Sequence, residues 1–395
     1  MRATRLIPAL ALLTLAVPRP ASAQDGDPAG YIARIEGRQS PNRQGWDSYT
    51  IQELMQRFRI PGVSIAVIRD FRIHWAKGYG VADAETGQPV DTGTAFQAAS
   101  ISKPVFAMAM VKLMQDGRLS LDADVNTILT SWKVPSSELT REQPVTLRSL
   151  ASHTSGADDG FGFPGYAPSE PRPTLVQILN GEKPSNVGPV KFVRLPYSGA
   201  KYSGGGVVLA QLAITDLVKQ PFSDFMRETI LVPLAMSRSS FEQPMNDAFA
   251  AKASKAHNGA GKRMDAPWHV YPEQAAAGLW TTPSDLARFA IEVQRAIRGP
   301  RGAVLTQASA REMLTAIGAG GFAVGFGVNQ RGEGWYFSHS GGNRGFGCDL
   351  VAHFRKGYGV VVMTNGDAGG RIINEIESRV AAAYGWDTLD KPIPR

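Results

Sequence analysis

Residues 63–79, VSIAVIRDFRIHWAKGY, determine the architecture that the sequence predicts. Residues 63–68 form a short apolar run rich in β-branched side chains, Arg69-Asp70 is a turn, and residues 71–79 follow as a second run of strand character. Two short strands around a tight turn predict a β-hairpin.

A matching set of short β-rich runs lies near the other end of the chain, separated by Gly, Asn or Lys-Gly turns. The runs cover residues 323–329, 334–338, 348–354 and 359–364. Residues 372–384 then have helical spacing, as do residues 46–58 ahead of the hairpin.

The middle of the chain has helical spacing, with long loops rich in Pro and Gly between the helices. The predicted helices cover residues 100–116, 174–179, 205–219, 223–234 and 284–297. The economical fold is α+β: strands from both chain ends join in one antiparallel sheet flanked by helices, with a mostly helical region inserted. We expect a sheet domain from residues 46–118 and 270–386 and a helical insertion over 119–269. The long loop over 158–173 is either a lid or a plain surface loop.

The N-terminus has the pattern of a bacterial secretory signal peptide. Arg2 and Arg5 precede an apolar run over residues 6–17, and Ala21-Ser22-Ala23 supplies a small-x-small cleavage site. We expect residues 1–23 to be removed after Ala23 and the polar residues 24–45 to form a flexible leader. The apolar run is shorter than the roughly 20 residues that a spanning helix needs. A secreted or periplasmic protein without stable membrane insertion is therefore expected, and an uncleaved anchor is the alternative.

The charge balance argues against a nucleic-acid partner. The 395 residues include 42 Lys and Arg and 35 Asp and Glu, a formal net charge of +7. Removal of residues 1–23 takes away three arginines and no acids, which leaves a net charge of +4. The densest basic stretch, residues 252–263, holds four cations and no interleaved aromatic residue. Nucleic-acid binding needs a clustered basic face.

Cysteine and histidine usage narrows the chemistry further. Cys348 is the single cysteine, so an internal disulfide and a zinc site of several thiolates are excluded. The six histidines show no ligand spacing with acids, so we expect neither a metal nor a cofactor. The sequence does not reveal an oligomeric state.

The pattern Ser-x-x-Lys occurs twice, at Ser100/Lys103 and at Ser198/Lys201. On a helix, residues three apart share a face, and a neutral lysine can take the proton of a serine that attacks a carbonyl carbon. Pro104 fits only near a helix start, so Ser100 should lie where backbone N–H groups suit an oxyanion. The second pair lies in a Gly-rich turn, where such residues need not face each other. The ordinary alternative for Ser100 is a helix N-cap.

A tyrosine can shuttle a proton when a cation lies nearby. The chain repeats Tyr-Ser-Gly at residues 197–199 and 202–204, and Tyr202 is the better candidate because it directly precedes a predicted helix. Such tyrosines can equally be ordinary loop anchors.

The segment His339-Ser340-Gly341-Gly342 follows a predicted strand. Its glycines let a substrate approach the backbone closely, and the N–H of Gly342 could face a carbonyl oxygen. The alternative is a strand end with a glycine turn.

Taken together and in this order, five stretches resemble the serine β-lactamase and penicillin-binding-protein superfamily. The most similar branch is the class C β-lactamase-like one, with D-Ala-D-Ala carboxypeptidases, D-amino-acid peptidases and esterases. The stretches are residues 94–103 around Ser100, TLRSLASHTSG at 146–156, residues 196–205 around Tyr202, AGLWTTPSDLARF at 277–289, and HSG at 339–341. The resemblance covers roughly residues 46–384.

The resemblance implies a role for each matching residue. Ser100 resembles the acylated nucleophile, Lys103 its activating base, and Tyr202 the second proton-transfer group. His339 would line the site from the strand, and the N–H groups of Ser100 and Gly342 would form the oxyanion hole. Ser340, Gly341 and Gly204 complete the expected substrate-binding residues. The implied mechanism is acylation of Ser100 followed by hydrolysis, without a cofactor.

Two positions depart from the family pattern. Gly204 stands where the family has an asparagine, and His339 where many members have lysine. Histidine is largely uncharged at neutral pH, so it should anchor a substrate carboxylate weakly. We therefore expect a secreted serine hydrolase that acts on a small ester or peptide substrate rather than an efficient lactam hydrolase. A true β-lactamase and a non-catalytic binder of cell-wall peptides are the alternatives.

Overall fold

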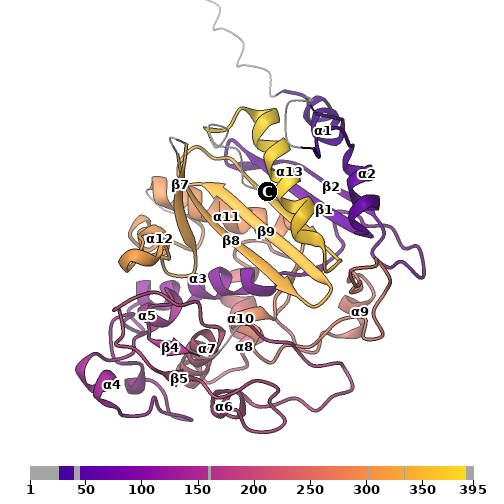
Figure 1. The fold of residues 1–395 in the computed structure, drawn as a ribbon. Helices are drawn as coiled ribbons and strands as arrows, with labels where there is room; N and C mark the ends of the chain where they lie inside the picture. Colours follow the sequence, from indigo (N-terminus) through magenta and orange to yellow (C-terminus); the bar gives the residue numbers. More distant parts are fainter. Residues whose placement is uncertain (1–25, 40–44, 159–161, 300–301, 333, 388–395) are drawn as a thin grey trace, which may run out of the picture.

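Strand β1 (Gly62–Arg69) lies beside strand β10 (Gly359–Thr364), so segments from the first and last parts of the sequence pair in one sheet (Figure 1). The computed structural model describes residues 26–39, 45–158, 162–299, 302–332 and 334–387. The main sheet is antiparallel with the order β2-β1-β10-β9-β8-β7. Its strands are β1 (Gly62–Arg69), β2 (Arg72–Gly80), β7 (Gly327–Arg331), β8 (Gly334–Asn343), β9 (Phe346–His353) and β10 (Gly359–Thr364). The expected α+β fold is confirmed.

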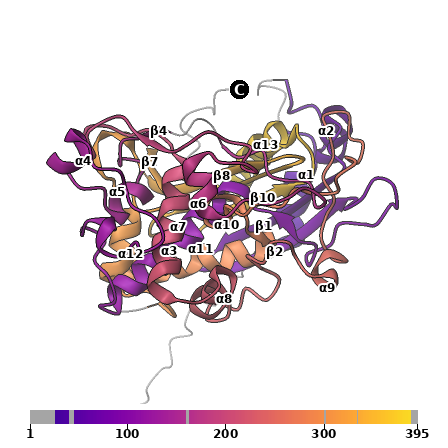
Figure 2. The ribbon, with the colours of Figure 1, turned by 90° about the horizontal axis from the view of Figure 1, so that it is seen from below.

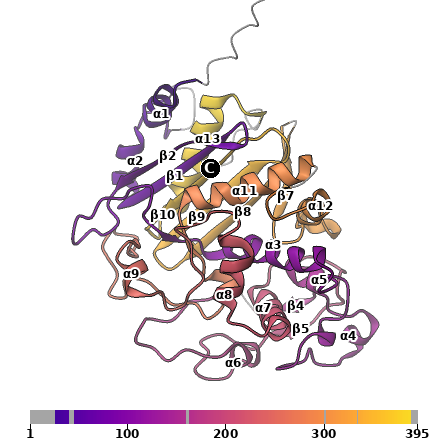
Figure 3. The same ribbon diagram turned by 180° about the vertical axis from the view of Figure 1, so that it is seen from behind.

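Helices cover both faces of this sheet (Figures 1 and 3). On one face lie α13 (Gly369–Tyr384), α1 (Pro28–Glu36) and α2 (Ile51–Phe58), and on the other lies α11 (Pro283–Arg298). Successive side chains of β1 point to opposite faces of the sheet and pack against the helices on each side. Val63, Ile65 and Val67 belong to the apolar cluster under α13, whereas Ala66 and Ile68 belong to the larger cluster on the opposite side.

The segment between β2 and β7 is mostly helical, and Figure 2 shows α3 and α7 near its centre. Two small strand pairs, β3 with β6 and β4 with β5, lie within it. Its elements are β3 (Phe96–Gln97), α3 (Ser102–Gln115), α4 (Glu138–Glu142), α5 (Leu147–Ala151), β4 (Ala157–Asp158), α6 (Leu175–Asn180), β5 (Lys191–Phe192), α7 (Gly204–Val218), α8 (Phe222–Met226), α9 (Asp247–Ala250), α10 (Gln274–Ala277), β6 (Trp280–Thr281), α11 and α12 (Gln307–Leu314).

Several boundaries differ from the sequence prediction. Helix α2 begins at Ile51 and not at residue 46, because Thr50 caps it in a capping box with Glu53. The helix predicted over 223–234 is α8 followed by a π turn over Arg227–Leu231. Strand β7 begins four residues later than expected. Strand β8 continues to Asn343 where a strand end was expected at residue 338, so His339 to Gly342 lie within the sheet.

The expectation of a flexible leader over residues 24–45 is wrong for residues 28–36, which form α1. Asp27 caps this helix by accepting a hydrogen bond from the N–H of Ala29, and Pro28 occupies its first turn. Ile35 is fully buried against the sheet layer. The expected signal peptide over 1–23, with its cleavage site after Ala23, lies outside the described residues.

A buried arginine explains why the leader is ordered. The side chain of Arg379, on α13, is fully buried and pairs with Glu375 at 2.8 Å. Its guanidinium also donates to four carbonyl oxygens, those of Ile35, Gly37, Trp46 and Tyr49, at 2.8–3.3 Å. One side chain therefore joins α1 and the segment before α2 to α13.

The division into 46–118 with 270–386 and 119–269 stays a prediction. Pairing of β3 with β6 joins segments that lie on either side of the proposed insertion. Among the described residues, no helix is both long and apolar enough to cross a membrane.

We expect Arg379→Ala to lower the free energy of unfolding by about 3–5 kcal/mol, because a buried carboxylate loses its cation and four carbonyl groups lose their donor. Urea unfolding measures the loss. The matched control is Arg371→Ala, an exposed arginine on the same helix, which should change the stability by less than about 0.5 kcal/mol. Equal stability of the two variants would contradict this role for Arg379.

Candidate active site

Ser100 and Lys103 meet at the start of α3. Ser100 lies in a 3₁₀ turn, η1 (Ala99–Ile101), and Lys103 in the first turn of the helix itself. The Nζ of Lys103 donates hydrogen bonds to Ser100 Oγ at 3.0 Å and to the carbonyl oxygen of Ala276 at 2.8 Å. The N-cap position of α3 falls on Ile101, so Ser100 is not the cap of that helix.

The turn that carries Ser100 is fixed by its neighbours. Ala99 has a φ of 46°, in the left-handed region, which a residue other than glycine adopts only where the surroundings hold it. The Oγ of Ser102 donates to the carbonyl of Ala99 at 2.5 Å and accepts from the N–H of Leu279 at 3.0 Å. The segment of residues 276–279 thus contacts both Lys103 and the turn that carries Ser100.

The second Ser-x-x-Lys pair has no such geometry. Ser198 Oγ donates to the carbonyl of Leu195 at 2.6 Å, and Lys201 forms an ion pair with Asp158. The two side chains therefore have separate partners, in agreement with the Gly-rich turn that the sequence indicates.

Tyr202 lies beside Lys103 and close to two histidine rings. The Nζ of Lys103 is 4.9 Å from the centroid of the Tyr202 ring. The ring of His153 is 4.2 Å away, centroid to centroid, and the ring of His339 is 6.1 Å away. Phe322 packs at the edge of His153, at 4.9 Å. Lys103, Tyr202 and His339, which the sequence analysis had selected, are thus gathered in one place.

His153 holds the Tyr202 loop. Its Nδ1 accepts the backbone N–H of Ser203 at 3.2 Å, and its carbonyl oxygen accepts the N–H of Lys201 at 2.8 Å. A backbone N–H can only donate, so Nδ1 carries no proton and the neutral ring has its proton on Nε2. His153 itself has a φ of 60° and is almost fully buried. The sequence pattern at residues 146–156 indicated no role for His153 itself.

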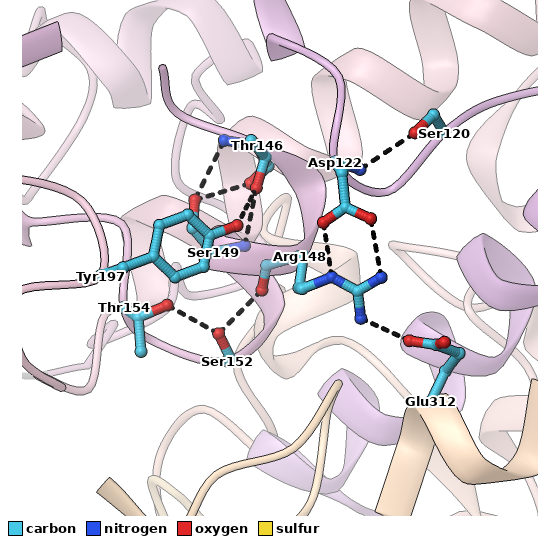
Figure 4. Close-up of polar contacts among 9 residues, drawn as sticks. All are labelled: Ser120, Asp122, Thr146, Arg148, Ser149, Ser152, Thr154, Tyr197 and Glu312. Carbon is cyan, nitrogen blue, oxygen red and sulfur yellow. Dashed lines mark hydrogen bonds and ion pairs between the residues drawn. The ribbon is translucent and has the colours of Figure 1, made fainter. Parts of the chain in front are cut away.

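A polar network fixes the segment that leads to His153 (Figure 4). Thr146 forms a capping box with Ser149 at the start of α5, and its Oγ1 lies 2.6 Å from the hydroxyl of Tyr197. Arg148 binds both carboxylate oxygens of Asp122, at 2.6 and 2.9 Å, and also contacts Glu312. These hydrogen bonds hold the pKa of Asp122 below its usual value.

His339 presents an acceptor to the site. Its Nδ1 is 2.6 Å from the carbonyl oxygen of Ser340. A carbonyl oxygen can only accept, so Nδ1 carries the proton and Nε2 holds a free lone pair. This Nε2 is buried and makes no hydrogen bond.

Burial keeps both rings uncharged. Desolvation, followed by the nearby charge of Lys103, lowers the pKa of His339 to about 3. The same two causes, in the same order, lower the pKa of His153 well below its usual value. Near neutral pH, both imidazole rings near Lys103 are therefore uncharged.

Gly341 allows strand β8 to pack closely against the turn that carries Ser100. A Cβ on Gly341 would lie 2.4 Å from the carbonyl oxygen of Ala98 and 2.6 Å from Cys348 Sγ, so only glycine allows this approach. On Gly342 a Cβ would meet no atom within 4 Å, so open space lies beside this residue. Strand β8 therefore packs against η1 and places Gly342 next to an accessible region.

The side-chain amides of Asn343 and Gln97, which the sequence did not indicate, also link strand β8 to the residues around Ser100. Asn343 Nδ2 donates to Gln97 Oε1 at 2.9 Å and to the carbonyl oxygen of Ala277 at 3.1 Å. Gln97 Nε2 donates in turn to the carbonyl oxygen of His269 at 2.7 Å. No signal within the single sequence marked this contact, because the residues are far apart along the chain. Within the described ranges, no cluster of three or more His, Cys, Asp or Glu side chains could hold a metal ion.

Comparison with known proteins finds a matching family, curated relatives and solved structures of similar fold. The family model described as Beta-lactamase matches residues 49–383. Protein flp of Staphylococcus aureus strain N315 is 25% identical over 324 residues, which cover 80% of this chain and 61% of that protein. The chain therefore spans less than two thirds of the length of that relative. Esterase EstB of Burkholderia gladioli is 28% identical over 326 residues, 74% of this chain and 78% of EstB.

A solved structure gives the fold. The D-amino acid amidase of Ochrobactrum anthropi SV3, in complex with L-phenylalanine, superposes with a TM-score of 0.67 at 21% identity, covering 90% of this chain and 98% of the amidase. The superfamily that the five sequence stretches indicated is confirmed.

The neutral state of His339 predicts a pH-dependent stability. In the unfolded chain, the His339 ring binds a proton below about pH 6.5, whereas in the folded protein the lowered pKa delays protonation until about pH 3. Stability must therefore fall as the pH is lowered through that window. We expect the stability advantage of wild type over His339→Gln to shrink by about 2 kcal/mol between pH 7 and pH 5 in urea unfolding. Parallel stability curves for the two proteins would contradict the burial of an uncharged ring.

Proposed function

Because this chain belongs to the beta-lactamase family, we propose that it is a serine hydrolase that cleaves an ester or amide through a covalent acyl-enzyme. The observation that carries the proposal is the hydrogen bond of 3.0 Å between Lys103 Nζ and Ser100 Oγ. A nucleophile and its base within such a distance are the signature of covalent catalysis by serine.

In the proposed acylation step, Lys103 acts as the general base and accepts the proton of Ser100 as Oγ bonds to the substrate carbonyl carbon. The carbonyl oxygen becomes an oxyanion, which the backbone N–H groups of Ser100 and Gly342 stabilise. Collapse of this intermediate breaks the bond to the leaving group, and Tyr202 supplies the proton that the leaving group takes. The carbonyl of Ala276 fixes the direction of the Lys103 amine throughout.

In the proposed deacylation step, water attacks the acyl carbon and transfers a proton to Tyr202. The water proton restores the Tyr202 hydroxyl, the ester bond to Ser100 breaks, and Lys103 returns to Oγ the proton that it accepted during acylation. His153 supports this step by holding the loop that carries Tyr202, since its Nδ1 binds the N–H of the next residue.

His339 favours a substrate without a carboxylate at this position. A neutral ring with a lone pair on Nε2 binds a hydrogen-bond donor and cannot form an ion pair with an anion. The similarity to an esterase supports an ester as the substrate, with D-amino-acid peptides as the second class to assay. We further propose, from the signal-peptide pattern over residues 1–23, that the hydrolase is exported.

A fluorophosphonate probe tests the proposal, because it forms a stable bond only with an activated serine. We expect stoichiometric labelling of wild type, with the adduct on the peptide that contains Ser100, and loss of the label in Ser100→Ala. Ser198→Ala is the matched control: it removes the serine of the second Ser-x-x-Lys pair and should label like wild type.

Folded wild type that takes no label would contradict the hydrolase and favour a non-catalytic peptide-binding protein. Rates on a p-nitrophenyl ester, a D-alanyl peptide and a chromogenic cephalosporin then rank the substrate classes. A wide lead for the cephalosporin would contradict our interpretation of Gly204 and His339.

A further inference from the structure

An aromatic ring fills the space next to Gly204, where the family pattern has an asparagine. Gly204 is the first residue of α7 and follows Tyr202 by two positions. A Cβ on Gly204 would lie 2.6 Å from Cε2 and 3.1 Å from Cζ of Phe163. A side chain at position 204 would therefore require the Phe163 ring to move, so the residue at position 204 and the position of this ring are coupled.

Phe163 belongs to a segment that is bound firmly to the rest of the molecule. Two residues on, Gly165 packs so closely that a Cβ there would lie 2.6 Å from the Tyr271 ring. Tyr166 then exchanges two backbone hydrogen bonds with Val270, at 2.9 and 2.7 Å. The carbonyl oxygen of Gly165 accepts a further bond from Asn186 at 2.9 Å. Residues 163–166, part of the expected lid or surface loop, are therefore held in place by packing and hydrogen bonds; we call them the 163–166 wall.

The position of this wall relative to the site follows from its contacts. Its partner segment at residues 269–271 leads directly into α10, whose Ala276 carbonyl accepts from Lys103. Its other contact, Gly204, opens α7 directly after the Tyr202 loop. Phe163 is half-buried and packs against the main apolar cluster.

We infer that Phe163 determines acyl specificity, presenting an apolar face to the acyl chain of a substrate bound at Ser100. The inference rests on the proposed hydrolase and names its substrate class: esters with an extended, uncharged aliphatic acyl chain. Gly204 has no side chain and the Phe163 ring has no polar atom, so neither offers a side-chain hydrogen bond to an acylamide group. The ring offers instead a surface that removes methylene groups from water.

The test compares p-nitrophenyl acetate with p-nitrophenyl hexanoate. In Phe163→Ala we expect the ratio of kcat/KM for hexanoate to that for acetate to fall about tenfold. The matched control is Phe354→Ala, which should keep the wild-type ratio. Phe354 is also half-buried, but it follows the last residue of β9, at the opposite end of that strand from Cys348. An unchanged ratio in Phe163→Ala, even with both rates lowered, would overturn the inference. Phe163→Leu serves the same test should the alanine variant fail to fold.

A second pair of variants tests the coupling between Gly204 and Phe163. Gly204→Asn alone should lower kcat/KM on acetate by at least about tenfold, because the new side chain displaces the ring. Adding Phe163→Ala should recover most of that loss. Full activity of Gly204→Asn with Phe163 in place would overturn the inference.

Failure of this inference can be separated from failure of the proposed function. Wild type that neither labels with the fluorophosphonate nor hydrolyses acetate contradicts the hydrolase itself. Wild type that does both, with the acyl-chain ratio unaffected by Phe163, contradicts only the specificity role.

Discussion

The amine of Lys103 donates one hydrogen bond to Ser100 Oγ and another to the carbonyl oxygen of Ala276, and the arrangement of the whole site depends on these two bonds. The first links residues of one helical turn, so local geometry is enough to form it. The second links the start of α3 to α10, 173 residues later in the chain. A lysine with 5% exposure needs such fixed partners, because burial of its amine without acceptors would be costly.

The main sheet can pack close to Ser100 and Lys103 only because the residues at the point of contact have small side chains or none. Gly341 on β8 and Cys348 on β9 face each other in the register and lie against the turn before Ser100. The Cys348 thiol donates to the carbonyl of Ala98 at 3.0 Å, and burial raises its pKa well above the usual value. Cys348 is thus a small, uncharged side chain that packs between the sheet and the turn that carries Ser100. This constraint explains why strand residues from the end of the chain can help to form the site.

Local patterns in the sequence predicted the parts of the molecule that local physics governs. The hairpin of β1 and β2, strand β10 and the pairing of Ser100 with Lys103 follow from side-chain period, turn residues and helical spacing. Residues 28–36 were expected to be loose, since the stretch 24–45 as a whole is polar and rich in Gly, Pro, Asp and Arg. The buried guanidinium of Arg379, some 340 residues away, binds the carbonyl oxygens of Ile35 and Gly37 and so holds the helix in place. The roles of His153, Gln97 and Asn343 were missed for the same reason.

The central claim is that Ser100 and Lys103 work as a single unit, and the most direct measurement is a double-mutant cycle on kcat/KM for one ester. Residues that act together lose their effect together, so their losses are strongly non-additive. The account predicts that Ser100→Ala, Lys103→Ala and the double variant, each shown to fold, fall to the same residual rate within a few-fold. Losses that multiply in the double variant would mean that the two residues act independently, and would contradict the account.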